Sequence, residues 1–182
     1  WFSHDKKLLE RPFQEVLQSG KPDFPFCLGW ANHSWTNKHW EAGTRQQKER
    51  TLMEMVYNEE EYKLHFYDVL PALQDKRYIT VDNKPLFLIW SPLDIPDAQR
   101  FVEIWQTLAK ENGLEGIHFV GLQHNISYAS VRTKDILTKR IPNQAPQLYA
   151  EVLSKGFAAI NSRGFHRADL YCRSLWDICW RG

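Results

Sequence analysis

The stretch Phe24–Trp35 constrains the fold of this chain more than any other part of the sequence. Up to Trp30 it is an apolar run that is too short for a buried helix and contains Pro25 and Gly29. Such a run is typical of a strand that is buried on both faces of a parallel sheet. After Trp30 the stretch becomes aromatic and polar. We therefore expect an α/β fold with ligand-binding groups at the carboxyl end of this strand.

Two later runs repeat this pattern. Residues Pro85–Trp90 and Gly116–Leu122 are short apolar runs, and each is followed by polar side chains. Amphipathic segments over Asn58–Leu73 and Asp97–Asn112 precede them and have helical spacing. The order strand, helix, strand, helix, strand predicts a parallel sheet with right-handed crossovers.

Three further local features have a structural interpretation. Asp82-Asn83 is expected to form a tight turn between two strands, because Asn tolerates the left-handed conformation. Apolar spacing within Asp5–Ser19 predicts a helix that ends at Gly20, with Pro12 shifting its start. Beyond Ser127 the patterns weaken, and only 147–160 suggests another helix.

Composition excludes several classes of protein. The net charge is +1 and no basic block occurs, which argues against binding to nucleic acid or to an anionic membrane. No apolar run approaches the roughly 20 residues of a membrane span, and Trp1–Gly20 is too charged for a signal peptide. The three cysteines are widely separated, which favours a reducing compartment. We expect a cytoplasmic protein of unknown oligomeric state.

Two motifs resemble the WbsX-type glycosyltransferase family, which is also described as glycoside-hydrolase-family-99-like. The first is Pro25-Phe26-Cys27-Leu28-Gly29-Trp30-Ala31-Asn32-His33-Ser34-Trp35-Thr36, followed by Trp40-Glu41. The second is Asp75-Lys76-Arg77-Tyr78-Ile79-Thr80-Val81-Asp82-Asn83-Lys84-Pro85-Leu86. The likeness covers residues 1–122.

The resemblance implies a (β/α)8 TIM-like barrel, of which this chain would supply a central portion as one partial domain over residues 1–182. Such barrels take about 250 residues, and the sequence opens on Trp1 rather than Met. The resemblance also implies a glycosyltransferase of bacterial surface polysaccharide, such as O-antigen or capsule. The alternatives are an endo-mannosidase-like glycoside hydrolase with the same pocket and a carbohydrate-binding module without catalysis.

One departure from the family pattern affects the catalytic candidates. The family has Glu where this chain has His33. Histidine cannot replace a carboxylate nucleophile, but it can act as a general base near neutral pH. Either His33 performs that role, or Glu41 or Glu54 supplies the carboxylate, or this member is inactive.

The remaining candidates are rings and polar groups at expected strand ends. A sugar presents an apolar face and a rim of hydroxyls, so its pocket combines flat rings with amide, imidazole or carboxylate groups. The predicted substrate-binding residues are Trp30, Asn32, Trp35, Trp40, Trp90, His124 and Asn125. Buried core rings and hydrogen-bonded loop residues are the structural alternatives for these positions.

No cofactor or metal is predicted. The sequence has no Walker loop, no Gly-rich dinucleotide turn and no Asp-x-Asp motif. The pairs His33 with His39 and His118 with His124 have a spacing of six residues, which fits no usual ligand pair. The expected partner is an oligosaccharide or polysaccharide, with a nucleotide-sugar donor left open.

Overall fold

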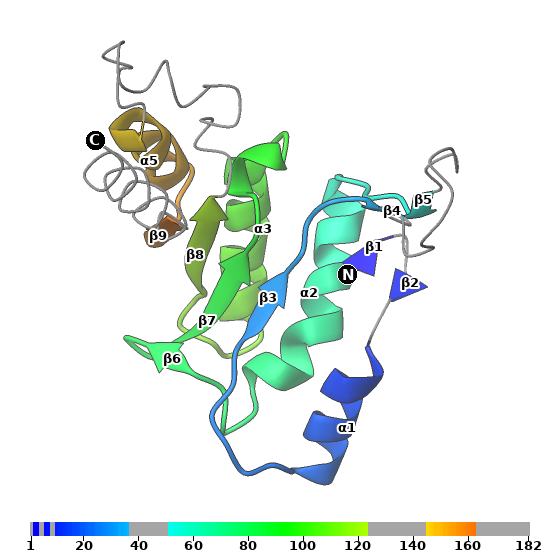
Figure 1. Cartoon of the computed structure of the whole chain (residues 1–182). Helices are drawn as coiled ribbons and strands as arrows, with labels where there is room; N and C mark the ends of the chain where they lie inside the picture. Colours follow the sequence, from blue (N-terminus) through cyan, green and yellow to red (C-terminus); the bar gives the residue numbers. More distant parts are fainter. Residues whose placement is uncertain (1, 4–5, 8–9, 37–50, 124–144, 163–182) are drawn as a thin grey trace, which may run out of the picture.

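A parallel sheet forms the centre of the fold. The computed structural model describes residues 2–3, 6–7, 10–36, 51–123 and 145–162. Four strands pair in the order β3 (Leu28–Trp30), β7 (Lys84–Ile89), β8 (His118–Gln123) and β9 (Ala159–Ser162), and all are parallel. Figure 1 shows the arrowheads of β3, β7 and β8 pointing the same way. The prediction of an α/β fold with a parallel sheet is confirmed.

Helices connect these strands. α2 (Glu59–Leu73) precedes β7, α3 (Ala98–Glu111) lies between β7 and β8, and α5 (Ala145–Ser154) lies between β8 and β9. Asn58 caps α2 by accepting a hydrogen bond from the Glu61 N–H at 2.8 Å. The helix therefore begins where the capping residue and the first acidic turn predict it. None of the described helices is both long and apolar enough to cross a membrane.

Shorter elements surround the sheet. They are the antiparallel pair β1 (Phe2–Ser3) and β2 (Lys6–Lys7), helix α1 (Arg11–Ser19), the antiparallel pair β4 (Trp35–Thr36) and β5 (Thr51–Met53), strand β6 (Thr80–Val81) and the 3₁₀ helix η1 (Pro92–Asp94). β6 pairs with β7 through the turn at Asp82 and Asn83, whose φ angles are 49° and 60°. The predicted left-handed turn is confirmed. Helix α1 begins at Arg11 because Pro12 occupies its first turn.

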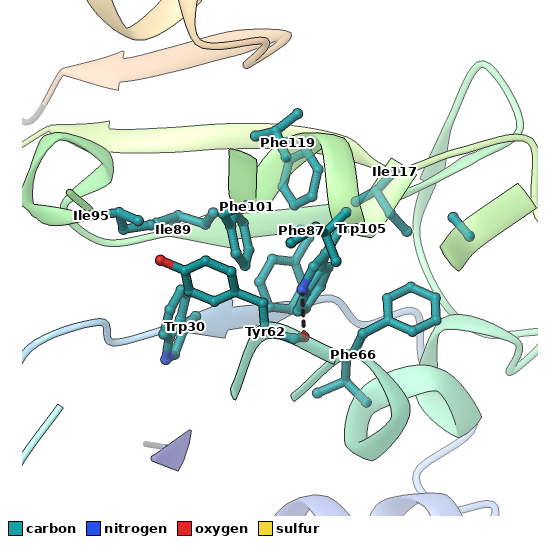
Figure 2. Packing of buried hydrophobic residues seen from close by; sticks show 14 of the residues in the cluster. Trp30, Tyr62, Phe66, Phe87, Ile89, Ile95, Phe101, Trp105, Ile117 and Phe119 are labelled. Atoms are coloured by element: carbon teal, nitrogen blue, oxygen red, sulfur yellow. Dashed lines mark hydrogen bonds between the residues drawn. The ribbon is translucent and has the colours of Figure 1, made fainter. Parts of the chain in front are cut away.

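The hydrophobic core lies on one side of the sheet, which we call the helix-covered face. Phe87, Ile89 and Phe119 point to this side and are at most 1% exposed. They pack against aromatic side chains of α2 and α3 (Figure 2). The Trp105 indole N–H donates to the Tyr62 carbonyl at 2.9 Å and joins the two helices. Each of these buried side chains contributes about 1.5–3 kcal/mol of transfer free energy.

Alternate residues of the same strands form a second face. Leu86 and Leu88 of β7 and Val120 of β8 are half-buried, whereas their neighbours along each strand are buried. Strand alternation explains this pattern, because successive side chains point to opposite sides of a sheet.

The strand expected over Phe24–Trp30 differs from the prediction. Regular pairing begins only at Leu28, and β3 hydrogen-bonds to β7 alone among the described strands. Phe24 is 70% exposed and only Trp30 is buried. Pro25 has no N–H to donate, and Phe26 makes only an isolated bridge to Tyr78. The expectation of a strand buried on both faces was therefore wrong.

Candidate functional site

The carboxyl ends of β3 and β7 are joined by one side chain, and we call this region the carboxyl edge. Asn32 is completely buried. Its Nδ2 donates to the Ser91 carbonyl at 2.8 Å, and its Oδ1 accepts from the Ser91 N–H at 2.9 Å. The Asn32 side-chain amide thus makes the same two hydrogen bonds to Ser91 that a residue of a neighbouring strand would make. Asn32 fixes the two loops that leave β3 and β7 relative to each other.

Tyr57, which directly precedes the capping residue of α2, supports the same junction. Its hydroxyl donates to the Asn32 carbonyl at 2.6 Å, and its ring meets Trp30 edge-on at 6.2 Å between centroids. Burial raises the pKa of the Tyr57 phenol, and the negative charge of Asp94 raises it further. The phenol is therefore protonated at neutral pH and acts as a hydrogen-bond donor.

Asp94 is a carboxylate at this edge that the sequence analysis did not single out. It ends η1, which begins three residues after the last residue of β7, and its N–H donates to the Ser91 carbonyl at 3.0 Å. Its side chain is exposed. A Cβ at Gly121 would lie 2.8 Å from Pro92 Cγ, so glycine in β8 allows η1 to lie against the sheet. The only sequence signal for Asp94 was its place four residues after the apolar run Pro85–Trp90.

His33, Ser34 and Trp35 follow Asn32 in the loop that leaves β3. The Ser34 hydroxyl accepts from the Met55 N–H at 3.0 Å, which ties this loop to the end of β5. His33 and Trp35 are half-buried, and Trp35 pairs with Met53 in the hairpin of β4 and β5. Glu54 comes directly after β5 and is exposed.

The backbones of Trp30 and Trp90 are hydrogen-bonded to each other, but their side chains lie on different faces of the sheet. The Trp90 N–H donates to the Trp30 carbonyl at 3.0 Å. Trp30 is in register with Ile89, packs on Phe101 with centroids 5.5 Å apart, and is 6% exposed. Trp90 follows Ile89, so strand alternation directs it to the opposite side. The two indoles therefore do not form one flat platform.

Four of the predicted residues fall in segments that the structure does not describe. Trp40, Glu41, His124 and Asn125 lie outside the described residues. Among the residues that are described, no group of three or more His, Cys, Asp or Glu side chains is arranged to hold a metal ion.

Comparisons with known proteins complete the description. The family described as "Glycosyltransferase WbsX" matches residues 1–167. Two similar proteins, both called "Uncharacterized protein WxcX", come from two strains of Xanthomonas campestris pv. campestris. Each is 25% identical over 123 residues, which is 68% of this chain and 17% of the relative. The chain thus spans about a sixth of the length of these relatives. No solved structure matches.

Proposed function

This chain belongs to the WbsX glycosyltransferase family, and from that premise we propose that it is part of a glycosyltransferase that builds bacterial surface polysaccharide. The acceptor is an oligosaccharide or polysaccharide, and the donor is a nucleotide sugar. The observation that carries the proposal is the Asn32 and Ser91 pairing, which fixes the loops bearing His33 and Asp94 at one carboxyl edge. Parallel α/β folds bind their ligands at this edge.

We assign different roles to the residues at the edge. His33 acts as the general base that takes the proton of the attacking hydroxyl, because an imidazole titrates near neutral pH. Asp94 binds sugar hydroxyls or orients that imidazole. Trp35 and Trp90 offer ring surfaces to the apolar side of the sugar. Asn32 is a positioning residue, because its buried amide already binds Ser91.

Glu54 and Glu41 remain alternative carboxylates. Glu54 is exposed beside the hairpin of β4 and β5. Glu41, with Trp40, His124 and Asn125, is proposed from the sequence alone.

The fold proposal is that the four parallel strands belong to a (β/α)8 barrel and that residues 1–182 are one partial domain. Its support is the row of half-buried apolar side chains on the second face, including Leu88 and Val120. A closed barrel would bury this row among side chains of further strands.

Donor-dependent elongation of oligosaccharide acceptors by the intact protein tests the function. His33→Ala and Asp94→Asn are each expected to lower turnover by about 100-fold, the usual contribution of a positioned acid or base. Glu111→Gln, an exposed change at the end of α3, is the matched control and leaves turnover unchanged. Glu41→Gln and Glu54→Gln test the alternative carboxylates in the same assay. Circular dichroism checks that each variant is folded.

The same assay separates the rival functions. Reducing ends released without a donor would indicate a hydrolase. Glycan binding with no product over long incubation would indicate a binding module. Turnover that is unchanged in both the His33 and the Asp94 variants would remove these residues from the mechanism.

A further inference from the structure

Asp97 lies where an aspartate side chain usually caps a helix. It is the residue before α3, and aspartate is favoured at this position because its carboxylate accepts from backbone N–H groups of the first turn. Asp97 makes no such hydrogen bond. Its Oδ1 instead accepts from the phenol of Tyr62, which lies 35 residues earlier in α2. A distant residue therefore holds the carboxylate in place of its own helix.

Tyr62 is a rigid donor for this hydrogen bond. It is only 1% exposed, its ring meets Phe101 edge-on at 5.1 Å between centroids, and its carbonyl accepts from the Trp105 indole at 2.9 Å. Figure 2 shows its hydroxyl directed toward Ile89, the last residue of β7. Burial raises the pKa of the Tyr62 phenol, and the hydrogen bond to the Asp97 carboxylate raises it further. The phenol therefore keeps its proton at neutral pH.

Most of the hydrogen-bonding capacity of the Asp97 carboxylate remains open to a ligand. The residue is exposed, and within the described ranges its carboxylate has no hydrogen bond or ion pair apart from the one with Tyr62. A carboxylate has about four acceptor positions on its two oxygen atoms, and Tyr62 fills one of them. A group that is already fixed loses less conformational entropy when it binds a ligand.

Asp97 lies beside the groups assigned above to the carboxyl edge. Asp97 and Asp94 are exposed residues of the loop that follows β7, and the buried Ile95 anchors this loop between them. The negative charge of Asp94 raises the pKa of Tyr57, and the Tyr57 phenol in turn acts on Tyr62. These interactions connect the Asp97 carboxylate to the region that carries the proposed site.

The chemistry of the carboxylate restricts what it can bind. A carboxylate only accepts hydrogen bonds, so it suits the hydroxyls of a sugar. An anionic diphosphate or a uronic acid would be repelled by Asp94 and Asp97 together. We propose that Asp97 binds hydroxyls of the acceptor sugar and that Tyr62 positions its carboxylate. This inference rests on the proposed function and specifies a neutral acceptor.

Acceptor kinetics at saturating donor test the proposal. The probes are neutral hexose oligosaccharides and the same oligosaccharides with primary alcohols oxidised to carboxylates. Asp97→Asn is expected to raise the KM for a neutral acceptor about tenfold, because a hydrogen bond to a charged group is lost. The kcat and the KM for the donor should stay within about twofold. The preference for neutral over oxidised acceptors should shrink, because one repelling charge is gone.

Two further variants separate substrate binding from a structural role. Asp82→Asn, an exposed change in the turn at the opposite end of β7, is the matched control and should leave the kinetic constants unchanged. Tyr62→Phe should raise the KM for the acceptor, and adding Asp97→Asn to it should raise that KM by less than in the unmodified protein. An unchanged acceptor KM in Asp97→Asn, with only a lower free energy of unfolding, would overturn the proposal.

A failure of the proposed function would give a different result. If none of the acceptors is elongated, the function fails, and calorimetric binding of the same probes then tests the Asp97 contact. Weaker binding of a neutral probe to Asp97→Asn than to the unmodified protein would support the contact. Equal binding to both proteins, or binding to neither, would overturn it.

Discussion

The helix-covered face and the second face of the sheet are built from alternate residues of the same strands, yet they are buried to different extents. Ile89 is completely buried, whereas its neighbour Leu88 is half-buried. The difference comes from α2 and α3, whose aromatic side chains pack on one side. The side of the sheet on which α2 and α3 pack is therefore the side that becomes the core.

The largest expected effect is at the centre of the helix-covered face. Trp105→Ala removes a fully buried ring and its hydrogen bond to the Tyr62 carbonyl. We expect a loss of about 3–5 kcal/mol in the free energy of unfolding, measured by chemical denaturation. Leu153→Ala on α5, where Leu153 is 47% exposed, is the control and should cost far less.

A pair of substitutions tests whether the two faces of the sheet still differ in burial in the intact protein. If the barrel closes in the intact protein, Leu88→Ala should cost about 2–5 kcal/mol, as much as Ile89→Ala. Both are measured by denaturant unfolding. A small cost at Leu88 beside a large cost at Ile89 would contradict the barrel proposal, because the second face would then remain open.

The pairing of Asn32 with Ser91 at the carboxyl edge provides the next prediction. Asn32→Ala leaves the Ser91 N–H without its partner in a buried position. The expected cost is about 2–3 kcal/mol, and turnover should fall because the loops after β3 and β7 lose their fixed spacing. Asn161→Ala, an exposed change in β9, should be nearly neutral in the same unfolding experiment. Equal effects of the two substitutions would show that the Asn32 pairing contributes little.

The last prediction is a pH dependence on the helix-covered face. His65 has a folded-state pKa of about 3, against an ordinary value of 6.5, because it is buried. Between pH 6.5 and pH 3, His65 binds a proton in the unfolded chain but not in the folded protein. The free energy of unfolding therefore falls as the pH drops below 6.5. The slope is about 1.4 kcal/mol per pH unit.

His65→Gln should remove this slope from denaturation curves recorded between pH 6.5 and 4. His118→Gln, at a half-buried position of β8, serves as the control. An unchanged slope in the His65 variant would mean that other groups cause the acid sensitivity.

Local patterns predicted the parts of the fold that depend on neighbours in sequence. The helix over Asn58–Leu73 and the turn at Asp82-Asn83 agree with the structure within a residue. The strand expected at Gly116–Leu122 is β8, His118–Gln123. In each case the capping residue, the turn residues or the apolar period lies within the element itself.

The site was harder to predict because its contacts join distant parts of the chain. Asn32 looked like a ligand-binding amide, but its partner Ser91 is 59 residues away. Trp30 was predicted to line a sugar pocket, but its ring packs against Phe101 and His65 in the hydrophobic core. Asp94 was not predicted, because its place at the carboxyl edge depends on η1 packing against Gly121 of β8.

The pairing of Asn32 with Ser91 has a consequence for protein engineering. Two loops that are far apart in the chain are tied to each other through the Asn32 side-chain amide. A chimaera that takes one of these loops from another family member should therefore take the other loop from the same donor. Designed libraries that vary these loops should keep Asn32 and Ser91 constant and vary the two loops together.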